Sequence, residues 1–194
     1  MAEAWFVTGT DTGVGKTLVA AALLRAAGAS GARTIGLKPI ASGAVATAEG
    51  LRNEDACALL AAMNQELPYA LVNPVVLAPA VAPHIALAEA GLALDVAALH
   101  ARCLPALARP HDVAVVEGAG GWRVPLNHAE TLADLARRLG FPVVLVVGLR
   151  LGCINHALLT AEAVRADGLR LAGWVANQVD PGMANLADNL ATLD

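Results

Sequence analysis

Short β-branched apolar runs alternate along this chain with longer stretches rich in alanine and leucine. The short runs predict five strands, at residues 5–8, 34–38, 112–117, 142–148 and 171–177. The longer stretches predict five helices, at residues 16–27, 54–63, 96–107, 132–139 and 155–167. Such alternation is typical of an α/β fold in which helices flank both faces of a mostly parallel central sheet. In these sheets, ligands bind at the carboxyl ends of the strands.

A proline-rich segment at residues 72–86 interrupts this alternation. It contains Pro74, Pro79 and Pro83. Proline lacks an N–H donor and clashes with the preceding helical turn, so this spacing is unfavourable to a helix. The segment is therefore predicted to be an extended connection or an edge strand.

Length and composition favour one cytoplasmic domain spanning residues 1–194. The chain is 57% hydrophobic with a mean hydropathy of +0.57. No apolar run reaches the ~18 residues of a membrane span, and no basic region followed by an apolar core marks the N-terminus for export. Cys57, Cys103 and Cys153 are too dispersed to indicate a zinc site or a disulfide framework. The net charge of −4 argues against a nucleic-acid partner, which needs a basic face.

A glycine-rich loop, GTDTGVGKT, connects the first predicted strand to the first predicted helix. The N–H groups of such a loop and of the helix N-terminus present partial positive charge to phosphate oxygens. Lys16 would add a full charge at the β- and γ-phosphates, and Thr17 a hydroxyl ligand for Mg²⁺. Five residues separate Gly9 from Gly15, so Thr10 fills the first glycine position of the usual pattern. The alternative is an ordinary glycine turn before a helix.

A second lysine, Lys38, closes the second predicted strand. Pro39 favours an extended conformation at Lys38, so its ammonium can project over the end of the sheet toward the phosphate loop. Two lysines near one triphosphate suit the stabilisation of charge on a transferred phosphoryl group. Ser42 and Gly43 follow in the same turn. The alternative is a solvated lysine at a strand terminus.

Carboxylates stand at two further positions near the predicted strand ends. Glu117 ends a buried apolar run and precedes Gly118-Ala119-Gly120-Gly121, where glycines allow close backbone approach to a ligand. Asp55 begins the second predicted helix, where an acidic residue is also favoured by the helix dipole alone. Thr17, Asp55 and Glu117 together would form an all-oxygen set suited to Mg²⁺.

The turn at residues 151–156 lies between the fourth predicted strand and the helix that follows it. A helix N-terminus at this point could bind a carboxylate through its N–H groups. A plain connecting loop with Asn155 as N-cap is the alternative, and the sequence does not separate the two. The histidines are scattered without metal-ligand spacing and are predicted to be surface or structural residues.

Eight motifs in this order make the chain similar to dethiobiotin synthetases. They are GTDTGVGKT, KPIASG, GLRNEDA, VNPVVL, PHIA, VEGAGGWRVPL, PVVLVVGLRLGCINHALLT and LAGWVANQV, between about residues 6 and 177. The resemblance implies a three-layer P-loop NTPase fold and a homodimeric ligase of biotin biosynthesis that depends on ATP and Mg²⁺. The implied reaction converts 7,8-diaminononanoate, CO₂ and ATP into dethiobiotin, ADP and phosphate, through a carbamate and a carbamic-phosphoric anhydride.

The resemblance also implies roles for individual residues. Lys16 and Lys38 would neutralise the moving phosphoryl group, while Thr12 and Ser42 would lie near the diamine and the carbamate. Mg²⁺ would be bound by Thr17, Asp55 and Glu117. The implied nucleotide contacts are Gly13, Val14, Gly15, Lys16, Thr17, Leu18, Asp55, Glu117, Gly118, Ala119, Gly120, Asn177 and Gln178, with Asn177 at the adenine and Gly118 also beside the substrate. The substrate carboxylate would be held by Gly152, Cys153, Ile154 and Asn155 of a second subunit, which makes the dimer a catalytic requirement.

The chain departs from the family pattern at two points, and each departure has an expected consequence. Position 13 is glycine, where some relatives have an acidic residue, so one polar contact is absent. Family members usually continue beyond the position of Asp194 with a Pro/Leu/Gly-containing segment that helps enclose the base and ribose. Without that segment, we expect weak discrimination between ATP and other triphosphates.

Two other classes of P-loop protein are the alternatives. Partitioning and septum-positioning ATPases typically add a lysine early in the phosphate loop, and this loop has none before Gly13. They also often carry a membrane-binding tail or a basic DNA-binding face, and neither is visible. A glutamine-dependent amide synthetase of the cobyrinate type would need a glutaminase domain, for which 194 residues leave no room.

Overall fold

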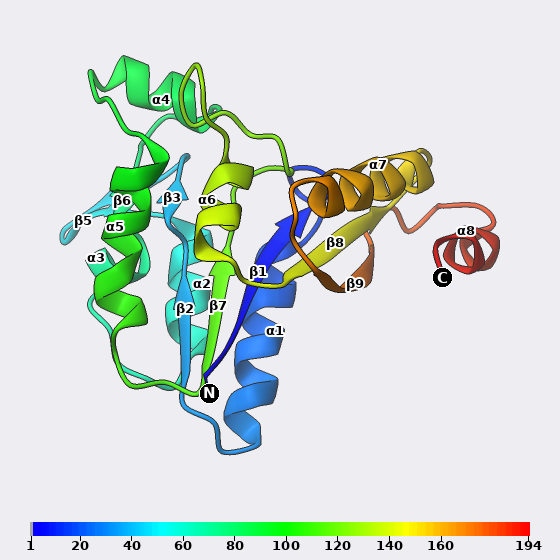
Figure 1. Cartoon of the computed structure of the whole chain (residues 1–194), viewed down its shortest axis with the longest axis horizontal. Helices are drawn as coiled ribbons and strands as arrows, with labels where there is room; N and C mark the ends of the chain where they lie inside the picture. Colours follow the sequence, from blue (N-terminus) through cyan, green and yellow to red (C-terminus); the bar gives the residue numbers. More distant parts are fainter. Residues whose placement is uncertain (1) are drawn as a thin grey trace.

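A five-stranded parallel sheet forms the centre of the computed structural model, which describes residues 2–194 (Figure 1). The strand order is β2–β7–β1–β8–β9, and every neighbouring pair is parallel. The strands are β1 (Glu3–Gly9), β2 (Thr34–Leu37), β7 (Val113–Glu117), β8 (Val143–Leu149) and β9 (Leu171–Gln178). The predicted α/β fold is confirmed, and all five predicted strands are present with ends shifted by one or two residues.

Helices cover both faces of this sheet. On one face, α1 (Lys16–Ala29) packs on β1, β2 and β7 and against α2 (Glu54–Ala62). The opposite face carries α5 (Val96–Leu107), α6 (Leu132–Leu139) and α7 (Cys153–Ala166), as Figure 1 shows. The connection after β1 leads to β2, whereas the connection after β7 leads the other way, to β8. Ligands of open α/β sheets bind beyond the strand ends where the connections diverge in this manner, here between β1 and β7.

Several short elements were not predicted. They comprise the helices α3 (Tyr69–Val72), α4 (Pro83–Glu89) and α8 (Leu186–Leu193), the strand β3 (Ile40–Ala41), and an antiparallel hairpin of β4 (Val45–Thr47) and β5 (Gly50–Arg52). β3 pairs in parallel with β6 (Val75–Val76), a short strand within the segment 72–86 that was predicted to be extended. None of the helices in the described part of the chain combines the length and apolarity needed to cross a membrane.

Two expectations about element boundaries were wrong. The segment 72–86 was expected to contain no helix, yet Pro83 begins α4. Proline is tolerated at this first helical position because its missing N–H would have no partner inside the helix. The helix expected at 155 begins at Cys153, with Gly152 as N-cap at φ 95°. Asn155 therefore lies in the first turn and is not the N-cap.

The end of β7 brings a charged group into the hydrophobic core. All five residues of this strand are buried, and the last of them, Glu117, is 0% exposed. The sheet position of β7, between β1 and β2, places this carboxylate beside the phosphate loop that follows β1. A buried carboxylate needs a cation or hydrogen-bond donors near it, so the surroundings of Glu117 mark the functional site.

Trp122 anchors the glycine turn that follows Glu117. Its ring is 5% exposed and meets Phe6 of β1 edge to face, with centroids 6.2 Å apart. Its Nε1–H donates to Oδ2 of Asp167 at 2.7 Å. The anchor connects the turn to the C-terminal end of α7, and so fixes one wall of the site.

Replacing Trp122 by phenylalanine should lower the free energy of unfolding by about 1.5–3 kcal/mol, because Asp167 loses a charge-assisted hydrogen bond. Urea denaturation measures the change. Trp174→Phe on β9 is the matched control, since the Trp174 indole makes no hydrogen bond within residues 2–194. Equal losses in the two variants would contradict an anchoring role for Trp122.

Candidate active site

The phosphate loop between β1 and α1 has a conformation that depends on glycine. Gly13 and Gly15 have φ angles of 75° and 92°, in the left-handed region. A Cβ on Gly15 would lie 2.2 Å from Nδ2 of Asn177, so a larger residue does not fit. Gly15 is the N-cap of α1, and among the residues that the structure describes no side chain caps this helix. The first N–H groups of α1 are therefore available to an anion.

Lys16 and Lys38 are the only two lysines of the chain, and both line the same cavity. Lys16 is 6% exposed and its Nζ donates to the carbonyl of Asp11 at 3.0 Å. Lys38 is 2% exposed and lies directly after β2. A buried ammonium group is costly unless an anion accompanies it. Lys16 makes no ion pair within residues 2–194, which indicates a site for an anionic ligand beside it.

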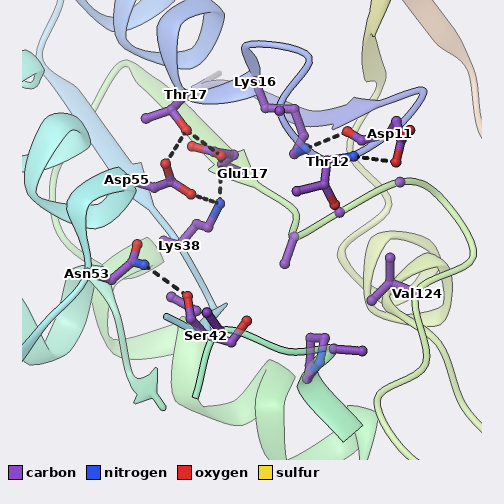
Figure 2. A pocket seen from close by; sticks show the side chains of 18 of the residues that line it. Asp11, Thr12, Lys16, Thr17, Lys38, Ser42, Asn53, Asp55, Glu117 and Val124 are labelled. Carbon is purple, nitrogen blue, oxygen red and sulfur yellow. Dashed lines mark hydrogen bonds and ion pairs between the residues drawn. The ribbon is translucent and has the colours of Figure 1, made fainter. Parts of the chain in front are cut away.

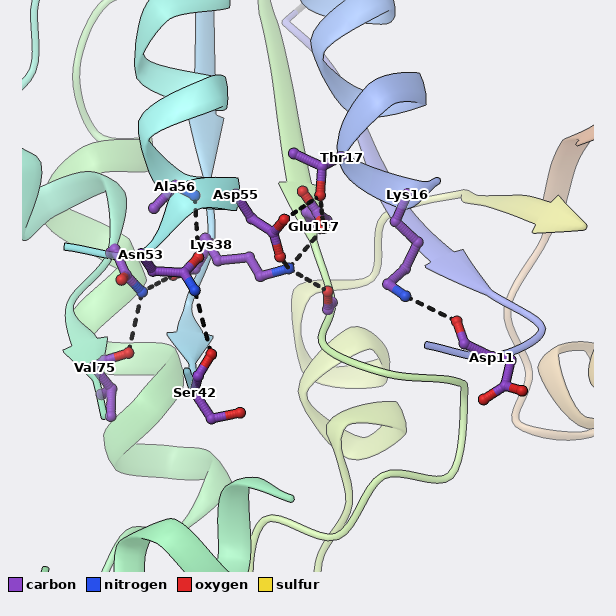
Figure 3. A network of polar contacts seen from close by, with 12 residues as sticks. Asp11, Lys16, Thr17, Lys38, Ser42, Asn53, Asp55, Ala56, Val75 and Glu117 are labelled. Atoms are coloured by element: carbon purple, nitrogen blue, oxygen red, sulfur yellow. Dashed lines mark hydrogen bonds and ion pairs between the residues drawn. The ribbon is translucent and has the colours of Figure 1, made fainter. Parts of the chain in front are cut away.

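The ammonium of Lys38 is at the centre of the polar network in Figure 3. It donates to Oε1 of Glu117 at 2.6 Å, to Oδ2 of Asp55 at 2.8 Å and to the carbonyl of Gly118 at 3.1 Å. The Thr17 hydroxyl lies 2.7 Å from Oδ1 of Asp55 and 2.9 Å from Oε1 of Glu117. Residues from α1, β2, α2 and β7 thus meet within a few ångströms.

Burial and charge shift the titration of this group. Burial, aided by the nearby Lys38 ammonium, lowers the pKa of Lys16 to about 8. Burial also raises the pKa of Glu117, against the opposing effect of Lys38. For Asp55, burial acts to raise the pKa, but Lys38 and the Thr17 hydroxyl together bring it below its usual value. Such perturbed groups in one cleft are typical of functional sites.

A cavity of about 770 Å³ opens between these groups and the loop before α4 (Figure 2). Its polar side is formed by the phosphate loop, both lysines and the two carboxylates. Its opposite side is apolar and is formed by Ala80, Val81, Ala82, Pro83 and Val124. The volume lies in the range of small-molecule sites, and the combination of one anion-binding wall and one apolar wall suits a nucleotide beside an aliphatic substrate.

The residues present fit Mg²⁺. Thr17, Asp55 and Glu117 offer only oxygen atoms, which this ion prefers. Oε2 of Glu117 is buried and has no hydrogen-bond partner within the described residues, as expected for an atom that awaits a ligand. The set contains two carboxylates and one hydroxyl, and nowhere in residues 2–194 do three or more His, Cys, Asp and Glu side chains form a group that could hold a metal.

Comparison with known proteins assigns the family. ATP-dependent dethiobiotin synthetase BioD of Pseudomonas paraeruginosa is 60% identical over 190 residues, which cover 98% of this chain and 83% of that protein. The enzyme of the same name from Chromohalobacter salexigens is 56% identical over 198 residues, covering 98% and 84%. This chain belongs to the dethiobiotin synthetase family. The broader family described as an AAA domain also matches, over residues 3–193.

Solved structures show that this chain has the P-loop NTPase fold. The kinase domain of the Escherichia coli tyrosine kinase ETK aligns with a TM-score of 0.56 at 14% identity, over 94% of this chain and 70% of that one. A ParA family ATPase from Chlorobium tepidum aligns with a TM-score of 0.53 at 14% identity, over 99% and 80%. At this identity, the likeness concerns the fold alone.

Most residues to which the dethiobiotin synthetase resemblance assigns a role lie together around the cavity. The cavity is lined by Thr12, Gly13, Gly15, Lys16, Thr17, Lys38, Ser42, Asp55, Glu117, Ala119 and Gly120. Gly118 contributes its carbonyl to Lys38. Gly120 has φ 64°, and a Cβ there would lie 2.7 Å from Val124, so this position also requires glycine.

The other assigned residues lie outside the cavity wall. Val14 lies within the loop and is buried, and Leu18 on α1 is 66% exposed. Asn177 donates its amide to the carbonyl of Val14 at 2.9 Å, which fixes it beside the loop, and Gln178 follows it at the end of β9. The turn from Gly152 to Asn155 starts α7 and does not line the cavity of its own chain.

Sequence reasoning missed two contributions to this dethiobiotin synthetase site. Asn53 caps α2 through its Oδ1 and donates its Nδ2 to the carbonyl of Ser42 at 3.2 Å, which positions the turn after Lys38. An asparagine immediately before a helical pattern was a detectable capping signal. Ala80, Val81 and Ala82 of the apolar wall carried no detectable signal, because alanine and valine suggest no chemistry by themselves.

Proposed function

We propose that this chain catalyses the ATP- and Mg²⁺-dependent carboxylation and ring closure of 7,8-diaminononanoate to dethiobiotin in biotin biosynthesis. Its strongest support is the convergence of both lysines and the Thr17–Asp55–Glu117 oxygen set on one cavity. That convergence occurs in a chain 60% identical to a protein named for this product. The proposal extends over a single domain of residues 1–194.

The proposed reaction has three bond-forming steps. One substrate amine adds to CO₂ and loses a proton, giving a carbamate. A carbamate oxygen then takes the γ-phosphoryl group of ATP, releasing ADP and leaving a carbamic-phosphoric anhydride. The second amine attacks the anhydride carbonyl, phosphate leaves, and the ureido ring is closed. No protein nucleophile is required, so the residues contribute positioning and charge.

Charge neutralisation falls to the two lysines. In the proposed assignment, the phosphate loop and Lys16 hold the β- and γ-phosphates, while Lys38 faces the transferred group from the carboxyl end of β2. Thr12 and Ser42 lie at the cavity wall beside the diamine. The apolar wall of residues 80–83 excludes water from the anhydride, which would otherwise be hydrolysed.

Thr17, Asp55 and Glu117 would hold Mg²⁺. When bound, the ion would supply positive charge to the phosphate oxygens. Lys38 shares both carboxylates with this site, so the same acidic pair orients the lysine and the metal.

A second copy of the chain is part of the proposal. The turn from Gly152 to Asn155 presents the N-terminus of α7, and the neighbouring Leu151, Leu158 and Leu159 are 95%, 49% and 57% exposed. In a homodimer, this turn would supply N–H groups to the substrate carboxylate of the other subunit.

Mass spectrometry of a complete reaction mixture tests the proposed function. The purified chain, 7,8-diaminononanoate, bicarbonate, Mg²⁺ and ATP should yield dethiobiotin, and omission of any component or addition of EDTA should abolish the product. ATP hydrolysis without dethiobiotin or diamine binding would contradict the proposal and favour a switch ATPase.

A further inference from the structure

Asp11 places a negative charge in the wall of the anion-binding cavity. It lies in the phosphate loop and lines the cavity together with Thr12 and Lys16. Its Oδ1 accepts the N–H of Thr12 at 2.7 Å, and its backbone carbonyl accepts the Lys16 ammonium at 3.0 Å. A carboxylate so close to the phosphate site would repel a triphosphate if nothing compensated its charge.

Arg150 supplies that compensation. Its Nη2 donates to Oδ2 of Asp11 at 2.5 Å, across the ends of the adjacent strands β1 and β8. The carbonyl of Arg150 accepts the N–H of Cys153 at 3.0 Å in the turn that starts α7. Arg150 therefore connects the phosphate loop to the turn that starts α7. This turn is the one for which we propose contact with the substrate of the second subunit.

Folding stability alone does not account for this ion pair. The side chains of Arg150 and Asp11 are 43% and 50% exposed. Pairs exposed to this degree contribute little to the free energy of folding, because water and salt screen them. Arg33 and Asp112 form a similar pair, 50% and 47% exposed, before β2 and β7 at the opposite end of the sheet.

We propose that Arg150 is a positioning residue for the nucleotide. It neutralises and orients Asp11, and through Asp11 it holds the Thr12 N–H and the Lys16 ammonium at the phosphate site. Its role in the reaction rests on the proposed function, but its role in nucleotide binding does not. Arg150 does not itself line the cavity.

Calorimetric titration with Mg·ADP tests the binding step on the full chain. Arg150→Ala should bind about tenfold more weakly than the unchanged protein, and the difference should shrink as salt is raised, because the interaction is electrostatic. Arg150→Lys should recover most of the affinity. Arg33→Ala, which removes the distant pair, should bind Mg·ADP normally. Equal affinities of Arg150→Ala and Arg33→Ala would overturn the proposal.

A second substitution separates charge compensation from general damage to the loop. Asp11→Asn keeps an oxygen for the Thr12 N–H but removes the charge that Arg150 opposes. The double variant, Asp11→Asn with Arg150→Ala, should therefore bind Mg·ADP better than Arg150→Ala alone. Additive losses would overturn the mechanism proposed for Arg150.

Steady-state kinetics extends the test to the reaction. Arg150→Ala should raise KM for ATP about tenfold and change kcat less, whereas loss of folded enzyme would lower kcat at constant KM. A change in kcat alone would contradict a role at the nucleotide. If the unchanged chain makes no dethiobiotin, the proposed function fails, and the calorimetric comparison still decides the role of Arg150.

Discussion

Replacing Lys38 by alanine should lower kcat for dethiobiotin formation by on the order of 10²–10³, the loss expected for one preorganised charge contact to a transition state. Mg·ADP affinity should stay within a few-fold of the unchanged protein. Lys38 is held by Glu117 and Asp55, at 2.6 and 2.8 Å, at the end of β2, whereas Lys16 belongs to the phosphate loop after β1 (Figure 2). In the proposed reaction the Lys38 ammonium would contact the group being transferred, and not the phosphates that remain on ADP. Quenched-flow and calorimetric measurements on the same preparation separate the two effects.

The buried ion pair requires a stability control in that experiment. Removing Lys38 leaves the 0% exposed carboxylate of Glu117 without its cation, and breaking a buried pair costs about 3–5 kcal/mol in well-studied cases. We expect a lower melting temperature for Lys38→Ala, with a larger increase on addition of Mg²⁺ than the unchanged protein shows. Kinetics should be measured below that transition. Normal turnover of the folded variant would rule out the proposed role of Lys38.

The elements that sequence reasoning placed well are those whose ends carry local signals. The boundaries of α5 agree with the prediction, and Asp95 caps that helix through the N–H of Ala98. Those of α6 agree as well, because Thr131 and Asp134 form a capping box and Gly140 ends the helix in the left-handed conformation. Such signals act within a few residues, so they can be read without knowledge of the fold.

The start of α7 and the presence of α4 were predicted wrongly, because the glycine and the proline at the starts of these helices were misinterpreted. Gly152 starts α7 through a positive φ that only glycine adopts easily, and its lack of a side chain made Asn155 look like the better cap. Pro83 was counted against a helix, although as the first helical residue it favours one. In both cases the residue type was informative, but its position relative to the helix start decided its meaning.

The site was predictable as a set of residues but not as a network. Lys38 follows β2 and Glu117 ends β7, so their gathering at one sheet edge followed from the parallel topology, and Asp55 in the first turn of α2 was recognisable as a helix-start residue. Their mutual distances depend on how α2 packs against α1, which no local pattern specifies. The contact of Asn177 with Val14, 163 residues away in sequence, was likewise accessible only from the fold.

Lys16→Ala should weaken Mg·ADP binding and lower kcat/KM, whereas Lys38→Ala should mainly lower kcat. Lys16 lies in the phosphate loop and would contact the phosphates before and during the reaction, so its loss should weaken Mg·ADP binding and lower kcat/KM together, by on the order of 10²–10³ in kcat/KM. Its ammonium makes one hydrogen bond, to the carbonyl of Asp11, and no ion pair within residues 2–194. The stability loss should therefore be smaller than for Lys38→Ala.

The two alanine variants serve as matched controls for each other, because they remove the only two lysines of the chain and both lysines line one cavity. Differential scanning calorimetry without ligand, followed by Mg·ADP titration and product assay, gives stability, ground-state binding and turnover for each. We expect Lys16→Ala to lose binding with stability nearly retained, and Lys38→Ala to lose turnover and stability with binding retained. The same changes in stability, binding and turnover in both variants would mean that the two lysines have one role. That result would contradict the separate roles in phosphate binding and phosphoryl transfer that the proposed function gives to Lys16 and Lys38.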